Sequence, residues 1–255
     1  MAELEALIFD VDGTLADTER DGHRPAFNRA FSDAGLDWDW SPETYGELLT
    51  VTGGKERMRF HMERENIELD VDGDVADYIA GLHAAKTEHY KAMMADGVVP
   101  LRPGVERLLN EARERGFRLA IATTTTPENV TALVTNTLGA EAMDWFEVIG
   151  AGDLVPAKKP APDIYTWVLE KMGLKGDQVI AFEDSGHGVT SAADAGIDSI
   201  LVTTNGYTVE QDFSRASVVL DQLGEADDSA SKQADKGPDP AGFVDVDYLI
   251  SLHQG

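Results

Sequence analysis

The sequence predicts an α/β protein, with a Rossmann-like doubly wound parallel sheet and a helical domain inserted after its first strand. Short apolar runs alternate along the chain with helical patterns, which is the order that gives a parallel sheet covered on both faces. The alternation breaks once, over residues 17–96, where Trp, His, Glu and Arg are frequent and several amphipathic helices are expected without a clear strand.

Six apolar runs are expected to form the strands, because each has the length and composition of a buried strand. In chain order they cover residues 4–9, 117–122, 146–149, 178–182, 199–202 and 217–220.

The helices between these strands are recognised by the residues that typically begin and end a helix. A cap residue and a proline at Thr126-Pro127 start one helix, which runs toward Gly139. Glycines are expected to end three further helices, and a closing helix is expected near the C-terminus. These four helices cover residues 105–115, 164–172, 188–195 and 243–253.

We expect residues 1–16 and 97–255 to form the α/β core domain and residues 17–96 to form the inserted helical cap domain. Residues 224–242 are polar and of low complexity, so we expect a mobile loop there within the core.

Composition excludes several classes of function. The formal net charge of -26 argues against a nucleic-acid-binding surface, which needs a basic patch. No apolar run approaches a membrane span, and the N-terminus lacks the basic start of a secretory signal. The chain has no cysteine, which excludes disulfides and thiol chemistry, and we expect a cytoplasmic protein. An anionic substrate would need local positive charge, so a bound cation and a few placed lysines are expected.

The stretch DVDG occurs twice, and the two copies differ in context. The first places Asp10 and Asp12 at the carboxyl end of a buried strand, where parallel sheets bind ligands, and Gly13 lets the chain turn away. Two buried acids this close need a cation or a shared proton. The second copy, in residues 70–74, follows no apolar strand and lacks the ligand spacing of a calcium loop, so a loop and helix start is expected.

Polar groups follow other strands as well. Thr123 and Thr124 precede a helix N-terminus, which favours an anion. Glu183 and Asp184 form a second acidic pair at a strand end, and Lys159 lies in the loop between these strands. A lysine there can offset phosphate charge, although a single lysine is more often a solvated surface group.

Together, DVDGT (10–14), Thr123, Lys159-Pro160 and Glu183-Asp184-Ser185 resemble the four motifs of the haloacid dehalogenase superfamily, in the expected order. The resemblance covers essentially the whole chain. Within the superfamily, the stretches DTERDGHRPAFNRAF, TGGKERM, ATTTTPENV and KKPAPDIY are most similar to the CbbY-type sugar-phosphate phosphatases.

The resemblance implies a role for each motif residue. Asp10 would be the nucleophile that forms an aspartyl-phosphate, and Asp12 the general acid and base. Thr123, Thr124 and Lys159 would hold the phosphoryl oxygens. Mg²⁺ would be held by Asp10, the Asp12 backbone carbonyl and Asp184, with Glu183 in or near its shell.

The cap is expected to select the substrate, and four of its residues are candidates for facing the open site. Lys55 and Arg57 suit a second phosphate or sugar hydroxyls, but could also belong to a solvated helix face. His23 could instead be a structural histidine, and the fourth candidate is Glu19.

The resemblance therefore implies a Mg²⁺-dependent phosphatase of small sugar phosphates, with xylulose 1,5-bisphosphate converted to xylulose 5-phosphate if the likeness extends to the substrate. Two alternatives are a phosphosugar mutase of the β-phosphoglucomutase kind and, from another class, a phospho-receiver binding module. The expected partner is a small phosphorylated sugar, with no nucleic acid and no membrane, and the fold is compatible with a monomer.

Overall fold

Six parallel strands form one sheet in the order β3-β2-β1-β4-β5-β6 in the computed structural model, which describes residues 2–69, 71, 73–234 and 236–255. The strands are β1 (Ala6–Phe9), β2 (Arg118–Ala122), β3 (Phe146–Gly150), β4 (Val179–Glu183), β5 (Ser199–Thr203) and β6 (Val218–Leu220). The chain winds outward in one direction from β1 to β3 and in the other from β4 to β6. The switch point between β1 and β4, where loops leave in opposite directions, is the place where such sheets bind ligands.

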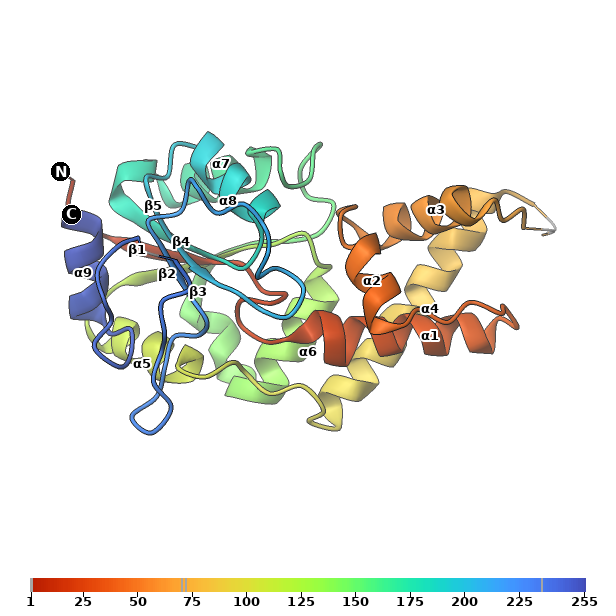
Figure 1. Ribbon diagram of the computed structural model, residues 1–255, viewed down its shortest axis with the longest axis horizontal. Helices are drawn as coiled ribbons and strands as arrows, with labels where there is room; N and C mark the ends of the chain where they lie inside the picture. The colour runs from red at the N-terminus through yellow and green to blue at the C-terminus, as the bar shows by residue number, and fades with distance from the viewer. Residues whose placement is uncertain (1, 70, 72, 235) are drawn as a thin grey trace.

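Helices cover both faces of the sheet (Figure 1). Because successive strand residues point to opposite faces, Leu7 and Phe9 pack on one side, and Ala6 and Ile8 on the other. The first side is covered by α5 (Val105–Glu114), α6 (Pro127–Leu138) and α9 (Val246–Gln254), and the second by α7 (Asp163–Met172) and α8 (Gly186–Asp194). Short 3₁₀ turns, η2 (Ala140–Trp145) and η3 (Gly176–Gln178), precede β3 and β4. The predicted fold class is confirmed.

The inserted segment forms a helical lobe beside the sheet, defined here as η1 to α4. Its elements are the π-helix η1 (Glu19–His23) and the α-helices α1 (Arg24–Asp33), α2 (Pro42–Leu48), α3 (Gly54–Glu65) and α4 (Val75–Ala95). They enclose their own apolar cluster, in which the rings of Phe27 and Trp40 lie 4.9 Å apart.

Helix α4 packs against the apolar clusters of both lobes. Ile79 and Leu82 in its first half lie in the cluster of the helical lobe, whereas Tyr90, Met93 and Met94 pack with the apolar cluster of the sheet. The division at residues 16/17 and 96/97 stays a prediction, since α4 packs continuously across the junction.

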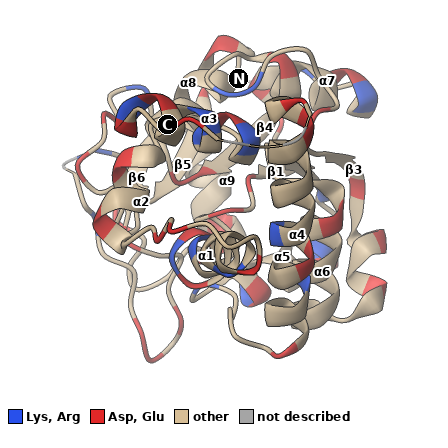
Figure 2. Cartoon of the chain, turned by 90° about the vertical axis from the view of Figure 1, so that its right-hand side faces the viewer, with Lys and Arg blue, Asp and Glu red and all other residues tan. Residues whose placement is uncertain are grey.

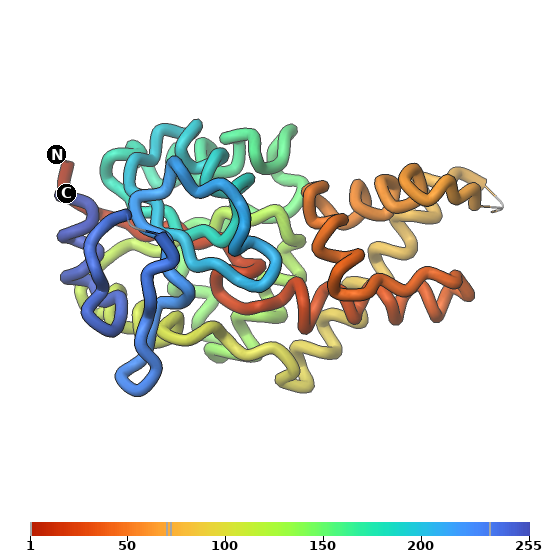
Figure 3. Tube along the Cα trace, viewed as in Figure 1, coloured from red at the N-terminus to blue at the C-terminus, as the bar shows by residue number. Residues whose placement is uncertain are grey.

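Two chain segments connect the lobes, and they run side by side (Figure 3). Ala16 forms an antiparallel bridge with Leu101, and the Arg102 N–H donates to the Leu15 carbonyl at 2.9 Å. The outgoing segment therefore leaves the site directly after Asp12 and is held by the returning one.

The two remaining sequence-based expectations concern loops. Asp70 and Asp72 of the second DVDG lie outside the described residues, while Asp74 caps α4, accepting a hydrogen bond from the Ala76 N–H at 2.7 Å. In residues 224–242, where Asp235 lies outside the described part, the described residues form no helix or strand. Lys232 pairs with Leu220 of β6 in an isolated bridge, and the mobility of the loop stays a prediction.

Acidic residues occur in both lobes (Figure 2). Among the described residues, no helix combines the length and the apolar character needed to cross a membrane.

Candidate active site

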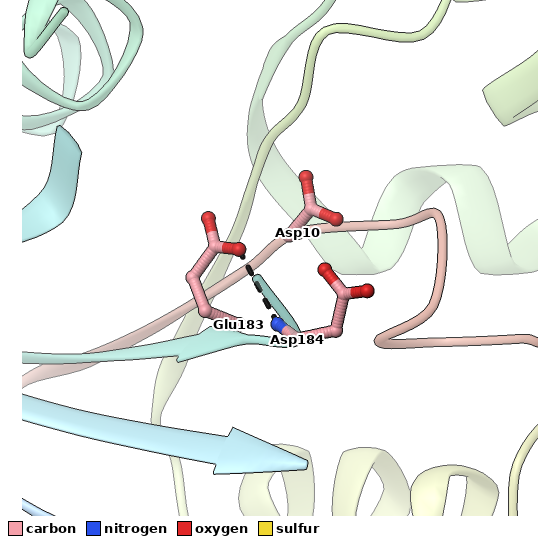
Figure 4. Close-up of side chains that lie close together, drawn as sticks. All are labelled: Asp10, Glu183 and Asp184. Carbon is pink, nitrogen blue, oxygen red and sulfur yellow. Dashed lines mark hydrogen bonds between the residues drawn. The ribbon is translucent and has the colours of Figure 1, made fainter. Parts of the chain in front are cut away.

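The switch point brings three carboxylates together (Figure 4). Asp10 directly follows β1, Glu183 ends β4, and Asp184 follows it. One carboxylate oxygen from each lies within 4.8 Å of the others, and all three side chains are buried. The strand pairing is the cause, because Phe9 is in register with Phe182 and parallel strands end at the same edge.

Lys159 reaches this cluster from the loop that precedes α7. Its Nζ donates to Asp10 Oδ1 at 2.6 Å, to Glu183 Oε1 at 2.6 Å and to the Ala122 carbonyl at 2.8 Å. These bonds use all three donors of the ammonium group. Tyr165 of α7 adds a hydroxyl bond to Glu183 Oε1 at 2.6 Å, so Glu183 holds both Lys159 and Tyr165 in place.

The single positive charge of Lys159 does not balance the charges of three carboxylates, and the raised pKa values of Asp10 and Asp184 show this. Burial raises the pKa of Asp10 to about 7 against the opposing effect of Lys159, and repulsion from Glu183 and Asp12 adds to the rise. Burial and repulsion from Asp10 and Glu183 also raise the pKa of Asp184 well above its ordinary value. A cation at this point would relieve the repulsion, and carboxylate oxygens are the donors that Mg²⁺ prefers. The residues present therefore fit a divalent metal ion.

Asp12 is held from the opposite side, by the helical lobe. Its Oδ1 accepts hydrogen bonds from the Thr18 hydroxyl at 2.6 Å and from His23 Nε2 at 2.8 Å. Lys86 of α4 donates to His23 Nδ1 at 2.6 Å. Because an ammonium group can only donate, Nδ1 must accept, and the ring proton must lie on Nε2, facing Asp12.

This arrangement stabilises the carboxylate form of Asp12. Burial alone would raise the pKa of Asp12, but the hydrogen bonds from His23 and Thr18, together with the positive charge of Lys86, bring the pKa below its ordinary range. Asp10 and Asp12 thus lie two residues apart with pKa values shifted in opposite directions, which is typical of paired catalytic carboxylates.

A cavity of about 440 Å³ lies between the lobes and opens onto Asp10, Asp12 and Asp184. Thr123 and Thr124 line it where the chain passes from β2 to α6, as the sequence predicts. The predicted start of α6 is also confirmed, but the Thr126 side chain forms no capping bond, and its hydroxyl is buried without a partner.

Of the four candidates in the helical lobe, Glu19 and Arg57 line this cavity. Tyr45 donates a short hydrogen bond to Glu19 Oε2 and accepts one from Arg57 Nη1 at 2.7 Å. Arg57 is only 6% exposed, so it does not belong to a solvated helix face.

The other two candidates lie elsewhere. His23 is buried and contacts Asp12 rather than the large cavity. Lys55 pairs with Asp153, which follows β3, at 2.9 Å and lines a second cavity of about 110 Å³ behind Asp12. The second cavity also adjoins Arg57 and Lys86.

Residues that were not foreseen from the sequence include Tyr165, Lys86 and Asn205. Asn205 Nδ2 donates to Asp184 Oδ2 at 2.8 Å and follows β5, so the strand-end argument applied to the other strands could have found it. Lys86 has apolar Leu82 and Tyr90 four residues on either side, and a lysine on an apolar helix stripe is a usable signal. No pattern in the sequence singles out Tyr165.

The fold and the site define a class of protein: a doubly wound α/β enzyme with a buried carboxylate cluster at its switch point and an inserted helical lobe over the cavity. The family model for haloacid dehalogenase-like hydrolases matches residues 4–196, and the chain belongs to that family.

Individual relatives are similar over most of their length. Protein CbbY of Rhodobacter capsulatus is 51% identical over 224 residues, which cover 88% of this chain and 96% of that protein. The plasmid-encoded Protein CbbY of Cupriavidus necator is 46% identical over 253 residues, covering 99% and 98%. A crystal structure of mutant CbbY from Rhodobacter sphaeroides in complex with xylulose-(1,5)bisphosphate matches with a TM-score of 0.79 and 43% identity, covering 86% of this chain and 94% of that one.

Proposed function

We propose that the protein is a Mg²⁺-dependent phosphatase of small sugar phosphates that acts through an aspartyl-phosphate on Asp10. The observation that carries the proposal is the arrangement of two carboxylates. Asp10 lies beside Lys159 and Asp184, whereas Asp12, two positions further along the chain, is held by a separate set of residues. The first group suits a nucleophile beside a cation, and the second suits proton transfer.

In the proposed reaction, an Asp10 oxygen forms a bond to phosphorus while the bond from phosphorus to the sugar oxygen breaks. The departing oxygen takes a proton from Asp12. Asp12 then accepts a proton from water, whose oxygen attacks phosphorus, and the Asp10–phosphorus bond breaks to release inorganic phosphate. The approach of the anionic phosphate raises the pKa of Asp12, which suits its first role as an acid.

The remaining groups position the phosphoryl group and balance its charge. Thr123 and Thr124 would face the phosphoryl group from the loop between β2 and α6, and Lys159 can exchange one of its carboxylate bonds for a phosphoryl oxygen. The bound Mg²⁺, held by Asp10, Asp184 and the Asp12 carbonyl with Glu183 nearby, would supply further charge neutralisation. Phosphoryl transfer depends mainly on such positioning and electrostatic stabilisation.

The second cavity supports a bisphosphate substrate. Its walls include the cationic side chains of Lys55, Arg57 and Lys86 as well as the carboxylates of Asp12, Glu19 and Asp153, so a second phosphate would meet positive charge there beside the acidic groups that pair with it. The complex of the CbbY relative with xylulose-(1,5)bisphosphate agrees with this. We propose xylulose 1,5-bisphosphate as the substrate and xylulose 5-phosphate as the product.

The test is release of inorganic phosphate from a panel of sugar mono- and bisphosphates, with Mg²⁺ and with chelator. Wild type is compared with Asp10→Asn and with Asp37→Asn, an exposed aspartate between α1 and α2. We expect turnover that requires Mg²⁺, falls by at least ~1000-fold in Asp10→Asn and is unchanged in Asp37→Asn. Interconversion of sugar phosphates that needs a bisphosphate primer would contradict the proposal and identify a mutase.

A further inference from the structure

Arg102 lies in the segment that returns from the helical lobe, and the residue is only 8% exposed. Its guanidinium donates to backbone carbonyls on three separate loops. The acceptors are Gly13, by a short bond, Thr204 at 2.6 Å and Asp221 at 2.6 Å. These residues follow β1, β5 and β6, so one buried side chain ties together three of the loops at the carboxyl edge of the sheet.

Two of those loops surround Asp184. Asn205 follows Thr204 and donates to Asp184 Oδ2 at 2.8 Å. The orientation of its amide is determined by a second bond, because Asn205 Oδ1 accepts from the Tyr207 N–H at 2.9 Å. The amide nitrogen must therefore face the carboxylate.

Gly13 lies against the same carboxylate oxygen of Asp184. A Cβ at this position would lie 2.2 Å from Asp184 Oδ2 and 2.7 Å from Asn205 Nδ2, and the backbone has a φ of +86°. Only glycine tolerates both conditions. Asp184 is thus enclosed between two loops, and Arg102 fixes the spacing of those loops through their carbonyls.

We propose that Arg102 and Asn205 are positioning residues that hold Asp184 in the orientation in which it binds the divalent cation. This inference rests on the proposed function, since it assigns the residues a role in the metal site of that enzyme. Asn205 also lines the cavity, but its assigned role is through its hydrogen bond to Asp184 and not through contact with the sugar phosphate. Loss of either residue would weaken metal binding, and groups of this kind typically contribute 10- to 100-fold to metal affinity.

The experiment is a calorimetric titration of metal-free protein with Mg²⁺ alone, for wild type, Asn205→Ala, Arg102→Met and Arg102→Lys. We expect the Mg²⁺ dissociation constant to rise about 10-fold or more in Asn205→Ala and Arg102→Met. Arg102→Lys keeps the charge but not the fork of donors, so its constant is expected to lie between those of wild type and Arg102→Met. The KM for the sugar phosphate at saturating Mg²⁺ is expected to change less than about twofold in Asn205→Ala, because that side chain acts through Asp184.

Arg107 offers a matched control. It too donates to loop carbonyls, those of Gly224 and Val244, each at 2.9 Å, but these lie away from the carboxylates. Arg107→Met is expected to lower thermal stability without changing the Mg²⁺ dissociation constant. An unchanged constant in Asn205→Ala, or an equal rise in Arg107→Met and Arg102→Met, would overturn the inference.

The same titration separates this inference from the proposed function. If wild type binds Mg²⁺ and Asn205→Ala binds it more weakly, but no sugar phosphate is turned over, the positioning role stands and the proposed function fails. If wild type does not bind Mg²⁺, both fail.

Discussion

At the scale of single residues, Lys86 determines which ring nitrogen of His23 carries the proton. The lysine donates to Nδ1, so Nε2 carries the proton that faces Asp12. Burial lowers the pKa of Lys86 to about 8, while the Asp12 and Glu19 carboxylates oppose the fall and Arg57 adds to it. The charge of a lysine in the helical lobe thus affects a carboxylate in the sheet lobe.

Replacing this lysine should therefore reduce turnover more than substrate binding. We expect Lys86→Met to lower kcat by about 10- to 100-fold, a part of the ~10²–10⁴ that general acid–base catalysis contributes. Steady-state phosphate release measures it, with Lys91→Met as the control, because Lys91 lies on the same helix and pairs only at the surface with Glu88. A normal kcat in Lys86→Met would show that Asp12 is positioned without the lysine.

The pH dependence follows with a definite sign. Lys86 donates to His23 as an ammonium group, and it loses that charge as the pH rises through about 8. We expect kcat/KM of the wild type to fall on the alkaline side with an apparent pKa near 8, because kcat/KM reports groups of the free enzyme. Lys86→Met should lack this fall. An alkaline fall of the same pKa in the variant would assign it to another group.

The same shift affects stability. The folded protein releases the Lys86 proton at about pH 8, whereas the ordinary value is 10.5. Between these values the unfolded chain binds more protons, so the contribution of Lys86 to the free energy of unfolding rises with pH. Chemical unfolding of wild type and Lys86→Met at pH 8 and pH 10 checks the sign. The stability of the wild type relative to the variant should increase toward pH 10, and a decrease would contradict the assignment.

The sequence predicted the motif residues because strand ends in a parallel sheet meet at one edge. Asp10, Thr123 and Asp184 could be placed together by that rule, whereas Lys159 lies in the loop before α7 and was assigned to the site by the resemblance. Lys86 could not be placed there, because its contact with His23 depends on how α4 crosses η1. A Cβ on Gly22 of η1 would lie 3.0 Å from the Tyr90 ring, and only tertiary packing determines such a close approach.

At the scale of elements, strand positions were predictable because each strand is a short apolar run of the length of a buried strand. Residues 178–182 became Val179–Glu183, a difference of one residue at each end. The role of α4 was not predictable from its pattern, since one helix packs against two apolar clusters. A hydrophobic stripe shows which face is buried but not which partner buries it.

Four charged groups join helix α3 to the loop after β3. Asp153 pairs with Lys55 at 2.9 Å and with Lys158 at 3.0 Å, and Lys158 also pairs with Glu56 at 3.2 Å. Because Lys55 and Glu56 belong to the helical lobe and the other two to the sheet lobe, the pairs favour the arrangement in which the lobes are closed over the cavity.

These pairs are partly exposed, so their effect should be small and sensitive to salt. An exposed pair contributes about 0–1 kcal/mol, and we expect Asp153→Asn to raise KM at low ionic strength by no more than about 5-fold. The difference should largely disappear in ~1 M salt, where the Debye length is about 3 Å. The control is Asp194→Asn, because Asp194 pairs at 2.7 Å with Arg215 within the sheet lobe. An effect on KM that persists at high salt would indicate that Asp153 contacts the substrate.

At the scale of the whole molecule, the chain has 47 acidic and 21 basic residues, and the formal net charge is -26. Folding brings these charges closer together than they are in the unfolded chain, so their mutual repulsion opposes the compact state. Several of the basic side chains are also committed to buried contacts, as Arg57, Lys86, Arg102 and Lys159 are, and do not offset acidic groups on the surface.

Screening should therefore stabilise the fold. We expect the melting temperature to rise as NaCl is increased from ~0.01 M to ~0.2 M, over which the Debye length falls from about 30 Å to less than 10 Å. Differential scanning calorimetry without Mg²⁺ measures this rise free of metal binding. Most of the screening of charges is complete at ~0.2 M NaCl, whereas salt strengthens apolar burial at higher concentrations. A melting temperature that rises only within the lower range therefore reports relief of charge repulsion. A melting temperature that is constant or falls over the range would mean that local ion pairs, which salt weakens, outweigh the repulsion of the net charge.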